Sequence, residues 1–179
     1  MPTVFAHAAA GVAAASILAP SDTPRRFWVA AAVCGALPDI DALGRPFGFR
    51  EWEDVLGGHR GITHSLVFAG VAAAAIGFWR LRGGRWEGSP LRLWLCLMLA
   101  GASHGLLDCL TTYGTGVALL APFSWERFSA PWHPIGAIGG GRMSIPVRLS
   151  ALMGNEVMWV WLPASLILLV YLYRRHRSR

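Results

Sequence analysis

Apolar residues gather in five runs along the chain, separated by polar segments. The runs are Val4 to Ala19, Phe27 to Leu37, Leu66 to Trp79, Leu93 to Leu107 and Val157 to Tyr173. Each is shorter than the roughly 20 apolar residues that a lone membrane span needs, so polar residues at the run ends must supply the missing length. Alanine and glycine are frequent within the runs, and small residues let helix backbones approach closely in lipid. The pattern predicts an all-α integral membrane bundle of about five helices.

The first run also allows a second interpretation, as a signal peptide. A signal peptide begins with a positively charged region, whereas the first basic residue of this chain is Arg25. We therefore interpret the first run as a helix of the bundle, and residues 1–179 as a single membrane-embedded domain.

The composition supports a membrane protein. Hydrophobic residues make up 54% of the chain and charged residues only 15%, which is too apolar for an ordinary soluble domain. All 16 basic residues are arginine, and they cluster beside the apolar runs, where membrane anchors are expected. We interpret this charge as membrane topology and expect no nucleic-acid partner. Cys34, Cys96 and Cys109 show no paired spacing and are interpreted as packed thiols.

Arginine is distributed unequally between the two sides that five alternating spans create. The clusters at 25–26, 80–92 and 174–179 fall on one side, which carries ten arginines and two acidic residues. The other side carries six arginines and eight acidic residues. By the positive-inside rule the first side is cytoplasmic, which places the amino terminus outside and the basic 174–179 tail inside.

Histidine and aspartate residues collect at the outer ends of the predicted helices. They are His7, Asp39, Asp41, His59, His64, His104 and Asp108. His104 and Asp108 share one helix face about 6 Å apart along the axis, so they can bind one metal ion together. A helix-end histidine beside a solvated aspartate is the alternative, but ionisable groups in membrane segments are usually functional. Taken alone, His7 would be interpreted as a packed histidine. Because it is predicted at the same membrane depth as the other residues, it becomes a candidate metal ligand.

Two carboxylates follow Pro38 at the end of the second run. If the chain is extended there, Asp39 and Asp41 point to the same side; if it continues helically, they diverge by about 200° and only one can bind a metal. Asp39 lies nearer the bilayer and is the expected ligand. Asp41 is expected to support the ligands or to transfer protons, and two interfacial carboxylates without a metal are the alternative.

The stretch 57–65, Gly-Gly-His-Arg-Gly-Ile-Thr-His-Ser, is the densest polar signal. Thr63 is predicted as the N-cap of the third helix, so that His64 and Ser65 would open a first turn whose free N–H groups favour an anion such as phosphate. Arg60 offers a planar donor fork for phosphoryl or carboxylate oxygens, or it snorkels at the interface.

The order of these motifs resembles the YdjM-type family of bacterial inner-membrane metal-dependent hydrolases, some of which are under LexA control. The resemblance covers most of the chain through about Ile135. It is carried by Ala6-His7, Pro38 to Asp41, His59 to Ser65, His104 to Asp108, Thr111 to Gly114 and Ala121 to Ser124. It implies a multi-pass protein of the bacterial inner membrane.

More remotely, the order of histidines and aspartates resembles the zinc-dependent phospholipase C and single-strand nuclease superfamily. That resemblance implies a first metal set and the start of a second one, formed by His7 with Asp108. The first set is Asp39, His64, His104 and Asp108. The chain departs from the superfamily in lacking an amino-terminal Trp, and only Glu126 and His133 follow the H-x-x-x-D motif within reach, so a full three-metal cluster is not expected.

These observations predict a membrane-bound metal-dependent hydrolase that cleaves a lipid-like phosphoester at the outer face. We expect one or two ions, Zn²⁺ first because imidazole with carboxylate suits it, with Mn²⁺ or Fe²⁺ as alternatives. Asp41 or His59 would transfer protons, and Arg60 would neutralise substrate charge. A metal-ion or proton transporter is the rival function, although transporters place their sites near the midplane between inverted repeats, and we find no repeat. The third candidate function is that of a structural protein whose helices are held together by a metal ion.

The predicted outer loop, residues 113–155, is long for a compact domain. It is rich in glycine and proline but contains many apolar side chains, which speaks against simple disorder. We expect it either to lie at the interface as a lid that admits a lipid or to pack against the bundle.

Overall fold

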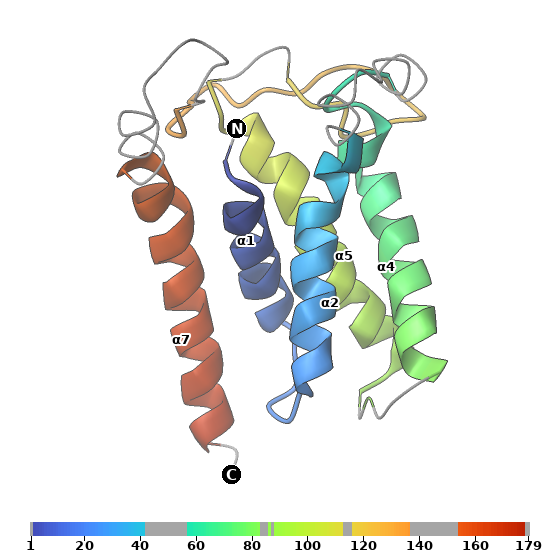
Figure 1. Cartoon of the computed structure of the whole chain (residues 1–179), viewed down its shortest axis with the longest axis vertical. Helices are drawn as coiled ribbons and strands as arrows, with labels where there is room; N and C mark the ends of the chain where they lie inside the picture. Colours follow the sequence, from blue (N-terminus) through green and yellow to red (C-terminus); the bar gives the residue numbers. More distant parts are fainter. Residues whose placement is uncertain are drawn as a thin grey trace.

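The computed structural model describes residues 2–41, 57–82, 86, 88–112, 116–136 and 154–177. Its five α-helices are α1 (Val4–Ser16), α2 (Arg25–Ala36), α4 (Leu66–Arg82), α5 (Pro90–Cys109) and α7 (Leu162–Arg177). The helices lie side by side, and the chain direction alternates from each to the next (Figure 1). The described residues contain isolated β-bridges but no strand, which confirms the predicted all-α bundle.

Two short helical elements flank the longer ones. The 3-10 helix η2 (Ile62–His64) precedes α4, and the π-helical turn η3 (Val157–Trp161) leads into α7. Thr3 ties the start of α1 to this turn, since its backbone N–H and its hydroxyl both donate to the Glu156 carboxylate. The first and last helices of the chain are therefore joined at the amino-terminal end of α1.

Local caps explain where the helices depart from the predicted apolar runs. α5 begins at Pro90 because the Ser89 hydroxyl accepts the Arg92 N–H at 3.2 Å, and proline suits the first helical position. α4 begins at Leu66, where the Ser65 hydroxyl accepts the Phe68 N–H at 3.1 Å. The prediction that Thr63 is the N-cap was wrong, because the chain makes a 3-10 turn before the helix starts.

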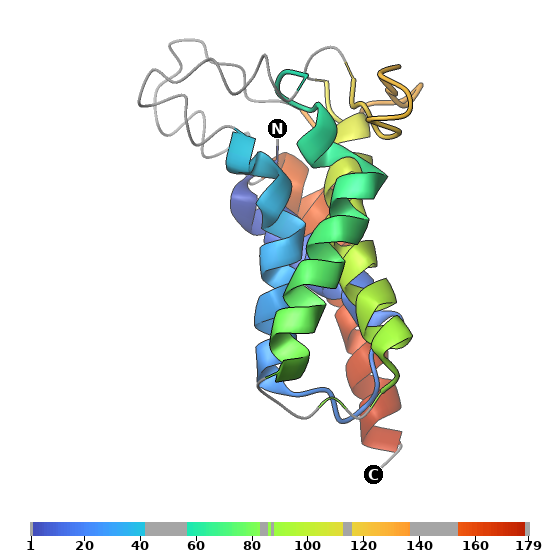
Figure 2. The same ribbon diagram turned by 90° about the vertical axis from the view of Figure 1, so that its right-hand side faces the viewer.

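The remaining boundaries shift by a few residues. α1 ends earlier than its apolar run, at Ser16, whose hydroxyl donates to the Ala13 carbonyl at 2.7 Å. α7 proper starts later than predicted because the π-helical turn occupies the beginning of the last run, and it continues into the basic tail as far as Arg177. The polar segments 57–65 and 116–136 gather at the end of the bundle where α1 begins (Figure 2).

Backbone-to-backbone contact joins α1 to α2. A Cβ atom added to Gly35 would lie 2.6 Å from the His7 carbonyl oxygen and 3.0 Å from the Gly11 Cα. Both distances are shorter than a packed side chain allows, so only glycine permits this approach. The close contact places His7 and the end of α2 next to α5, which packs against both helices.

The Gly35→Ala variant is therefore expected to lower the stability of the bundle. Its methyl group would meet main-chain atoms, which cannot rotate away, and overpacking of this kind costs about 1–3 kcal/mol. Thermal unfolding in detergent should show a clear fall in melting temperature. Gly154→Ala is the matched control, because no atom lies within 4 Å of the position that its methyl group would take. Equal melting temperatures for both variants would contradict the tight contact.

The helices present apolar residues to their surroundings. Two are long and apolar enough to cross a membrane, Pro90–Cys109 and Gly154–Arg177, and Val4–Ser16 and Leu66–Trp79 are shorter apolar helices. Large apolar side chains such as Phe5, Val71 and Leu166 are more than 60% exposed, which would be costly in water over so many positions. Such surfaces are expected of helices that contact lipid.

Candidate metal centre

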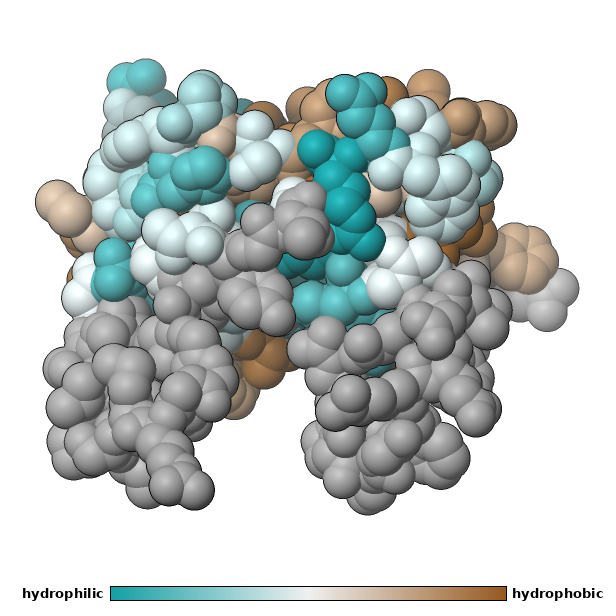
Figure 3. All heavy atoms as spheres, turned by 90° about the horizontal axis from the view of Figure 1, so that it is seen from above, coloured by the Kyte–Doolittle hydropathy of each residue, from teal (hydrophilic) through white to brown (hydrophobic). Residues whose placement is uncertain are grey.

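All eight residues singled out from the sequence come together at one end of the bundle. They come from α1 (His7), the 3-10 turn after α2 (Asp39, Asp41), the segment before η2 (His59, Arg60), η2 itself (His64) and α5 (His104, Asp108). Seen from this end, hydrophilic side chains occupy the middle of the described surface and apolar ones lie mostly toward its rim (Figure 3). His7, His104 and Asp108 are at most 1% exposed, so the cluster lies beneath that surface.

Two histidines and two carboxylates form the middle of the cluster. His64 Nε2 and His104 Nε2 are 3.2 Å apart, and Asp39 Oδ1 lies 3.7 and 3.5 Å from them. Asp108 Oδ2 lies 3.5 Å from the first nitrogen and 3.9 Å from the second. Two nitrogens bound to one zinc ion in tetrahedral geometry are separated by about 3.3 Å. The two histidines with either carboxylate therefore have the spacing of metal ligands, and His64, His104 and Asp108 are one of the groups that could hold an ion.

The hydrogen bonds of the two histidines leave their facing nitrogens bare. His104 Nδ1 lies 2.8 Å from the Gly35 carbonyl oxygen, which can only accept, so Nδ1 carries the proton. Thr63 donates its hydroxyl proton to Asp41 Oδ2 at 2.9 Å and can accept from His64 Nδ1 at 3.0 Å. In the neutral rings both Nε2 lone pairs then point at each other, and a cation between them removes this repulsion. The donor set thus fits a metal ion.

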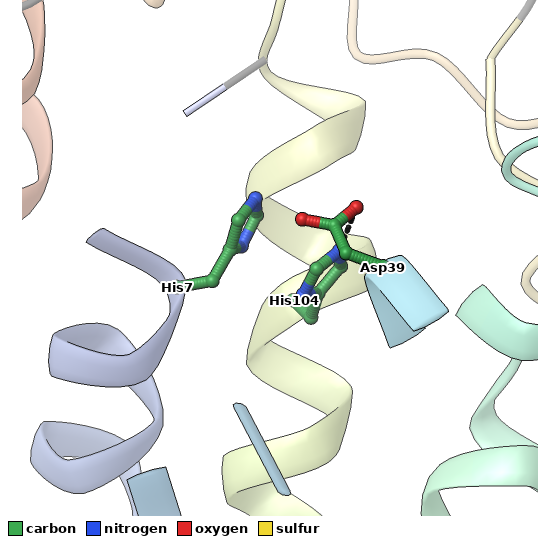
Figure 4. Close-up of side chains that lie close together, drawn as sticks. All are labelled: His7, Asp39 and His104. Carbon is green, nitrogen blue, oxygen red and sulfur yellow. Dashed lines mark ion pairs between the residues drawn. The ribbon is translucent and has the colours of Figure 1, made fainter. Parts of the chain in front are cut away.

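His7 lies against this set from α1. Its ring stacks on His104 with centroids 3.6 Å apart, and its Nε2 is 3.7 Å from Asp108 Oδ1. Figure 4 shows the two rings side by side, with Asp39 reaching toward His104 from the end of α2. Neither ring nitrogen of His7 has a hydrogen-bond partner among the described residues, although both are buried. Such an orphaned imidazole is suited to the same ion or to an adjacent one.

Asp39 and Asp41 lie next to different ring nitrogens of His64. The chain continues helically through residues 37–41, so the two carboxylates diverge, as the helical alternative required. Asp39 faces the Nε2 side, whereas Asp41 Oδ2 lies 3.6 Å from the Nδ1 side. Asp41 Oδ1 also lies 3.1 Å from His59 Nδ1, whose side chain is 7% exposed. A chain of polar groups therefore runs from the surface to a ligand candidate.

Arg60 is buried beside Asp108 and not extended toward solvent. It is 2% exposed, its Nη2 lies 2.9 Å from Asp108 Oδ1, and the same nitrogen donates to Thr111 Oγ1 at 2.8 Å. Its φ of 66° lies in the left-handed region, which a residue other than glycine adopts only when its surroundings hold it there. The side chain fixes one oxygen of Asp108 and leaves Oδ2 for the histidines.

The carboxyl groups outside the helices are ionised in this arrangement. Burial by itself raises the pKa of Asp39, but the adjacent rings of His104 and His64 outweigh it and hold the pKa well below its usual range. Burial likewise raises the pKa of Asp41, and the contact with His59 more than compensates, so this pKa is also lowered. Both groups are carboxylates at neutral pH, the form that binds a cation.

Residues 116–136 cover the cluster. The Leu66 N–H donates to the Leu119 carbonyl at 2.9 Å, and the Ala118 N–H donates to the Arg60 carbonyl at 3.0 Å. Phe123 is 87% and Trp132 58% exposed, so apolar side chains project from this segment. The described part of the predicted 113–155 loop therefore packs against the bundle and also presents aromatic residues. The rest of that loop, apart from 154–155, lies outside the described residues.

Sequence reasoning missed three contributors to the centre. The Gly35 carbonyl oxygen orients His104, and no sequence signal marks a backbone acceptor. Thr63 links Asp41 to His64, a role that its place beside His64 could have suggested. Gly105 admits the η2 turn to α5, because a Cβ there would lie 2.5 Å from the His64 carbonyl oxygen.

The comparisons with known proteins agree with this picture. A family model described as YdjM inner membrane protein matches residues 1–178. Inner membrane protein YbcI of Escherichia coli (strain K12) is 40% identical over 178 residues, which are 98% of this chain and 99% of that protein. No solved structure matches. The predicted membership of the YdjM family is thereby confirmed, whereas the more remote resemblance to the phospholipase C and nuclease superfamily stays a prediction.

Proposed function

Because the chain belongs to the YdjM inner membrane protein family, we propose that it is a metal-dependent hydrolase of the bacterial inner membrane, with its site at the outer face. The observation that carries the proposal is the approach of Asp39 and Asp108 to the facing ring nitrogens of His64 and His104. Burying ionisable groups in a membrane protein costs free energy, so a cluster of them points to a function other than packing.

The side chains have distinct roles in this proposal. Asp39, His64, His104 and Asp108 hold a divalent ion, Zn²⁺ first by ligand type, and His7 contributes to the same or an adjacent ion. A bound ion supplies a water molecule of lowered pKa and stabilises charge on the substrate oxygens.

The residues around the ligands complete the proposed mechanism. His59 accepts a proton near the surface, and Asp41 holds its ring in place. Arg60 keeps Asp108 oriented through their 2.9 Å contact. Its neutralisation of substrate charge stays a prediction.

Water or substrate would reach the site from the side on which Asp39 lies. Its side chain is 16% exposed, whereas those of His64, His104 and Asp108 are fully buried. Four protein ligands fill a tetrahedral shell, and a catalytic ion needs one open or loosely held position. The most exposed ligand is the one that can yield, so the open position lies on the Asp39 side.

A lipid-like phosphoester is the proposed substrate. The exposed Phe123, Trp125 and Trp132 stand at the same end as the cluster, and Trp132 packs edge to face on Trp159 of the last helix. Aromatic residues of this kind mark the headgroup level of a bilayer. A site just beneath that level is placed for headgroup phosphoesters.

The closed shell also favours a second candidate, a metal that only staples the helices together. It would join α1, α2, η2 and α5 without turnover, because a structural ion keeps all four protein ligands. A transporter is less well supported, since the candidate ligands come from the same end of α1, α2, η2 and α5 and not from the middle of the bundle.

The test is metal analysis of detergent-purified full chain, combined with a screen of lipid phosphomonoesters, phosphodiesters and carboxylic esters. We expect about one or two divalent ions per chain and hydrolysis of a phosphoester that stops when a chelator removes the metal. Metal without turnover on any of the three bond classes supports the staple. Turnover that survives chelation contradicts the proposal.

The site end is proposed to face outward and the carboxyl terminus inward. The described arginines at the opposite end, on α2, α5 and α7, favour the cytoplasm. In intact spheroplasts we expect a membrane-impermeant maleimide to label Ser129→Cys, and to label His176→Cys only after lysis. The wild-type protein gives the background, because Cys34, Cys96 and Cys109 are buried. The reverse labelling pattern would overturn the orientation and leave the metal centre intact.

A further inference from the structure

A basic pocket lies at the end of the bundle opposite the metal centre. It has a volume of about 170 Å³ and opens between the α1–α2 turn, the start of α5 and the end of α7. Three arginines line it together with four other residues of the turn and of α7: Arg92, Arg174, Arg175, Ala19, Pro20, Ser21 and Tyr171. None of these residues belongs to the site described above.

The end of α1 holds two of the guanidinium groups in place. Arg92 Nε donates to the Leu18 carbonyl at 2.7 Å, and Arg174 Nη2 donates to the Ser16 carbonyl at 3.1 Å. A guanidinium group has five N–H donors, so Arg92 keeps both terminal groups for another acceptor. Two of the three arginines, although exposed, are therefore held in place by main-chain carbonyls at the end of α1.

The pocket concentrates positive charge. Within the described ranges, no carboxylate lies at ion-pair distance from Arg92 or Arg174. Guanidinium groups that share a small pocket repel one another, and a planar donor fork binds phosphate oxygens particularly well. An anion with several oxygens is the ligand that this arrangement fits.

An apolar groove lies between the same three helices, farther toward the other end of the bundle. The groove, about 260 Å³, runs between α1, α5 and α7 and is lined by residues that include Ala10, Ala14 and Ile167. Ile17 also lines it, and Arg174 donates to the Ile17 carbonyl at 3.4 Å. On α1 the groove extends from Ala10 to Ile17, about 10 Å along the axis. A phosphate-binding pocket next to an apolar groove matches a headgroup with an acyl chain.

We propose that this pocket and groove bind one anionic phospholipid from the leaflet at the arginine end, with its phosphate among the arginines and one acyl chain along α1. Basic pockets between membrane helices on the cytoplasmic side bind anionic headgroups in this way. The bound lipid fills the space between α7 and the rest of the bundle, and its site is separate from the metal centre.

Native mass spectrometry of the full chain, with phosphatidylglycerol or phosphatidylcholine added to detergent, tests the proposal. We expect the wild-type protein to retain phosphatidylglycerol at least tenfold more strongly. The Arg92→Gln/Arg174→Gln variant should lose this preference. Arg177→Gln is the control, because Arg177 lies outside the pocket and contacts the Tyr173 ring at 5.3 Å.

A second variant covers the case in which loss of both arginines unfolds the protein. Ser21→Glu leaves the arginines and their bonds to α1 intact but adds a carboxylate to the pocket, so it should abolish the preference as well. Equal retention of both lipids by the wild type would overturn the proposal, and so would an unchanged preference in Ser21→Glu. Stabilisation by inorganic phosphate as strong as that by phosphatidylglycerol would show a soluble-anion site instead.

Discussion

The His104→Ala variant is expected to lose most of the metal bound to the purified protein. Its Nε2 is the nitrogen closest to that of His64, at 3.2 Å, and removing it opens one corner of the four-atom shell. Replacing a group that only supports a metal ligand lowers metal affinity by about 10–100-fold. A direct ligand should cost more than 100-fold, and Asp108→Ala should do the same. Metal content is measured by elemental analysis after gel filtration.

Two substitutions control for general damage to the bundle. Cys96→Ala changes a fully buried residue in the same helix, and His133→Ala removes an exposed histidine that hydrogen-bonds Ser129 at 2.7 Å. Both should keep the metal content of the wild type. Unchanged metal in His104→Ala and Asp108→Ala alike would refute the centre, whatever the protein does in activity assays.

The His59→Ala variant is expected to keep its metal and to lose turnover. His59 Nδ1 lies 3.1 Å from Asp41 Oδ1 at the edge of the cluster, and we assign it to proton transfer. Loss of a general acid or base lowers rates by about 10²–10⁴-fold. Asp41→Asn should lower turnover in the same direction, because the amide no longer accepts a proton from His59 Nδ1. The rate on the best phosphoester from the screen is the readout.

The same pair of measurements separates this role from its rivals. His59 also lies near Asp39 and His64 in a group that could hold a metal ion. Metal loss in His59→Ala would therefore make it a ligand and contradict the proton-transfer role. Wild-type rates in both His59→Ala and Asp41→Asn would remove both residues from the chemistry.

The sequence was sufficient to predict the bundle and the gathering of the site residues. Apolar runs with histidine or aspartate at their ends must alternate in direction, so the ends carrying these residues meet at one side. The i, i+4 spacing of His104 and Asp108 placed them on one helix face, and the structure has them there. These features depend only on helix periodicity and on the number of spans.

The details of the centre depend on contacts that periodicity does not contain. The sequence could not show that Arg60 adopts a positive φ and pairs with Asp108, because this follows from a turn set by neighbouring glycines and the covering segment. It could not show that the Gly35 carbonyl fixes the proton of His104, since that depends on how α2 packs against α5. The sequence also could not show that α4 is capped by Ser65 and not by Thr63, because the 3-10 turn before the helix decides this.

The length of α1 has a consequence for a bilayer that the chain spans as we propose. α1 has 13 residues and is about 20 Å long, against about 30 Å for a hydrocarbon core. The last apolar helix, Gly154–Arg177, has 24 residues and is long enough to span that core. Local thinning of the bilayer is one way to accommodate a helix that is too short. In the proposed orientation we expect such thinning beside α1, which would bring lipid headgroups closer to the level of His7 and of the proposed metal centre.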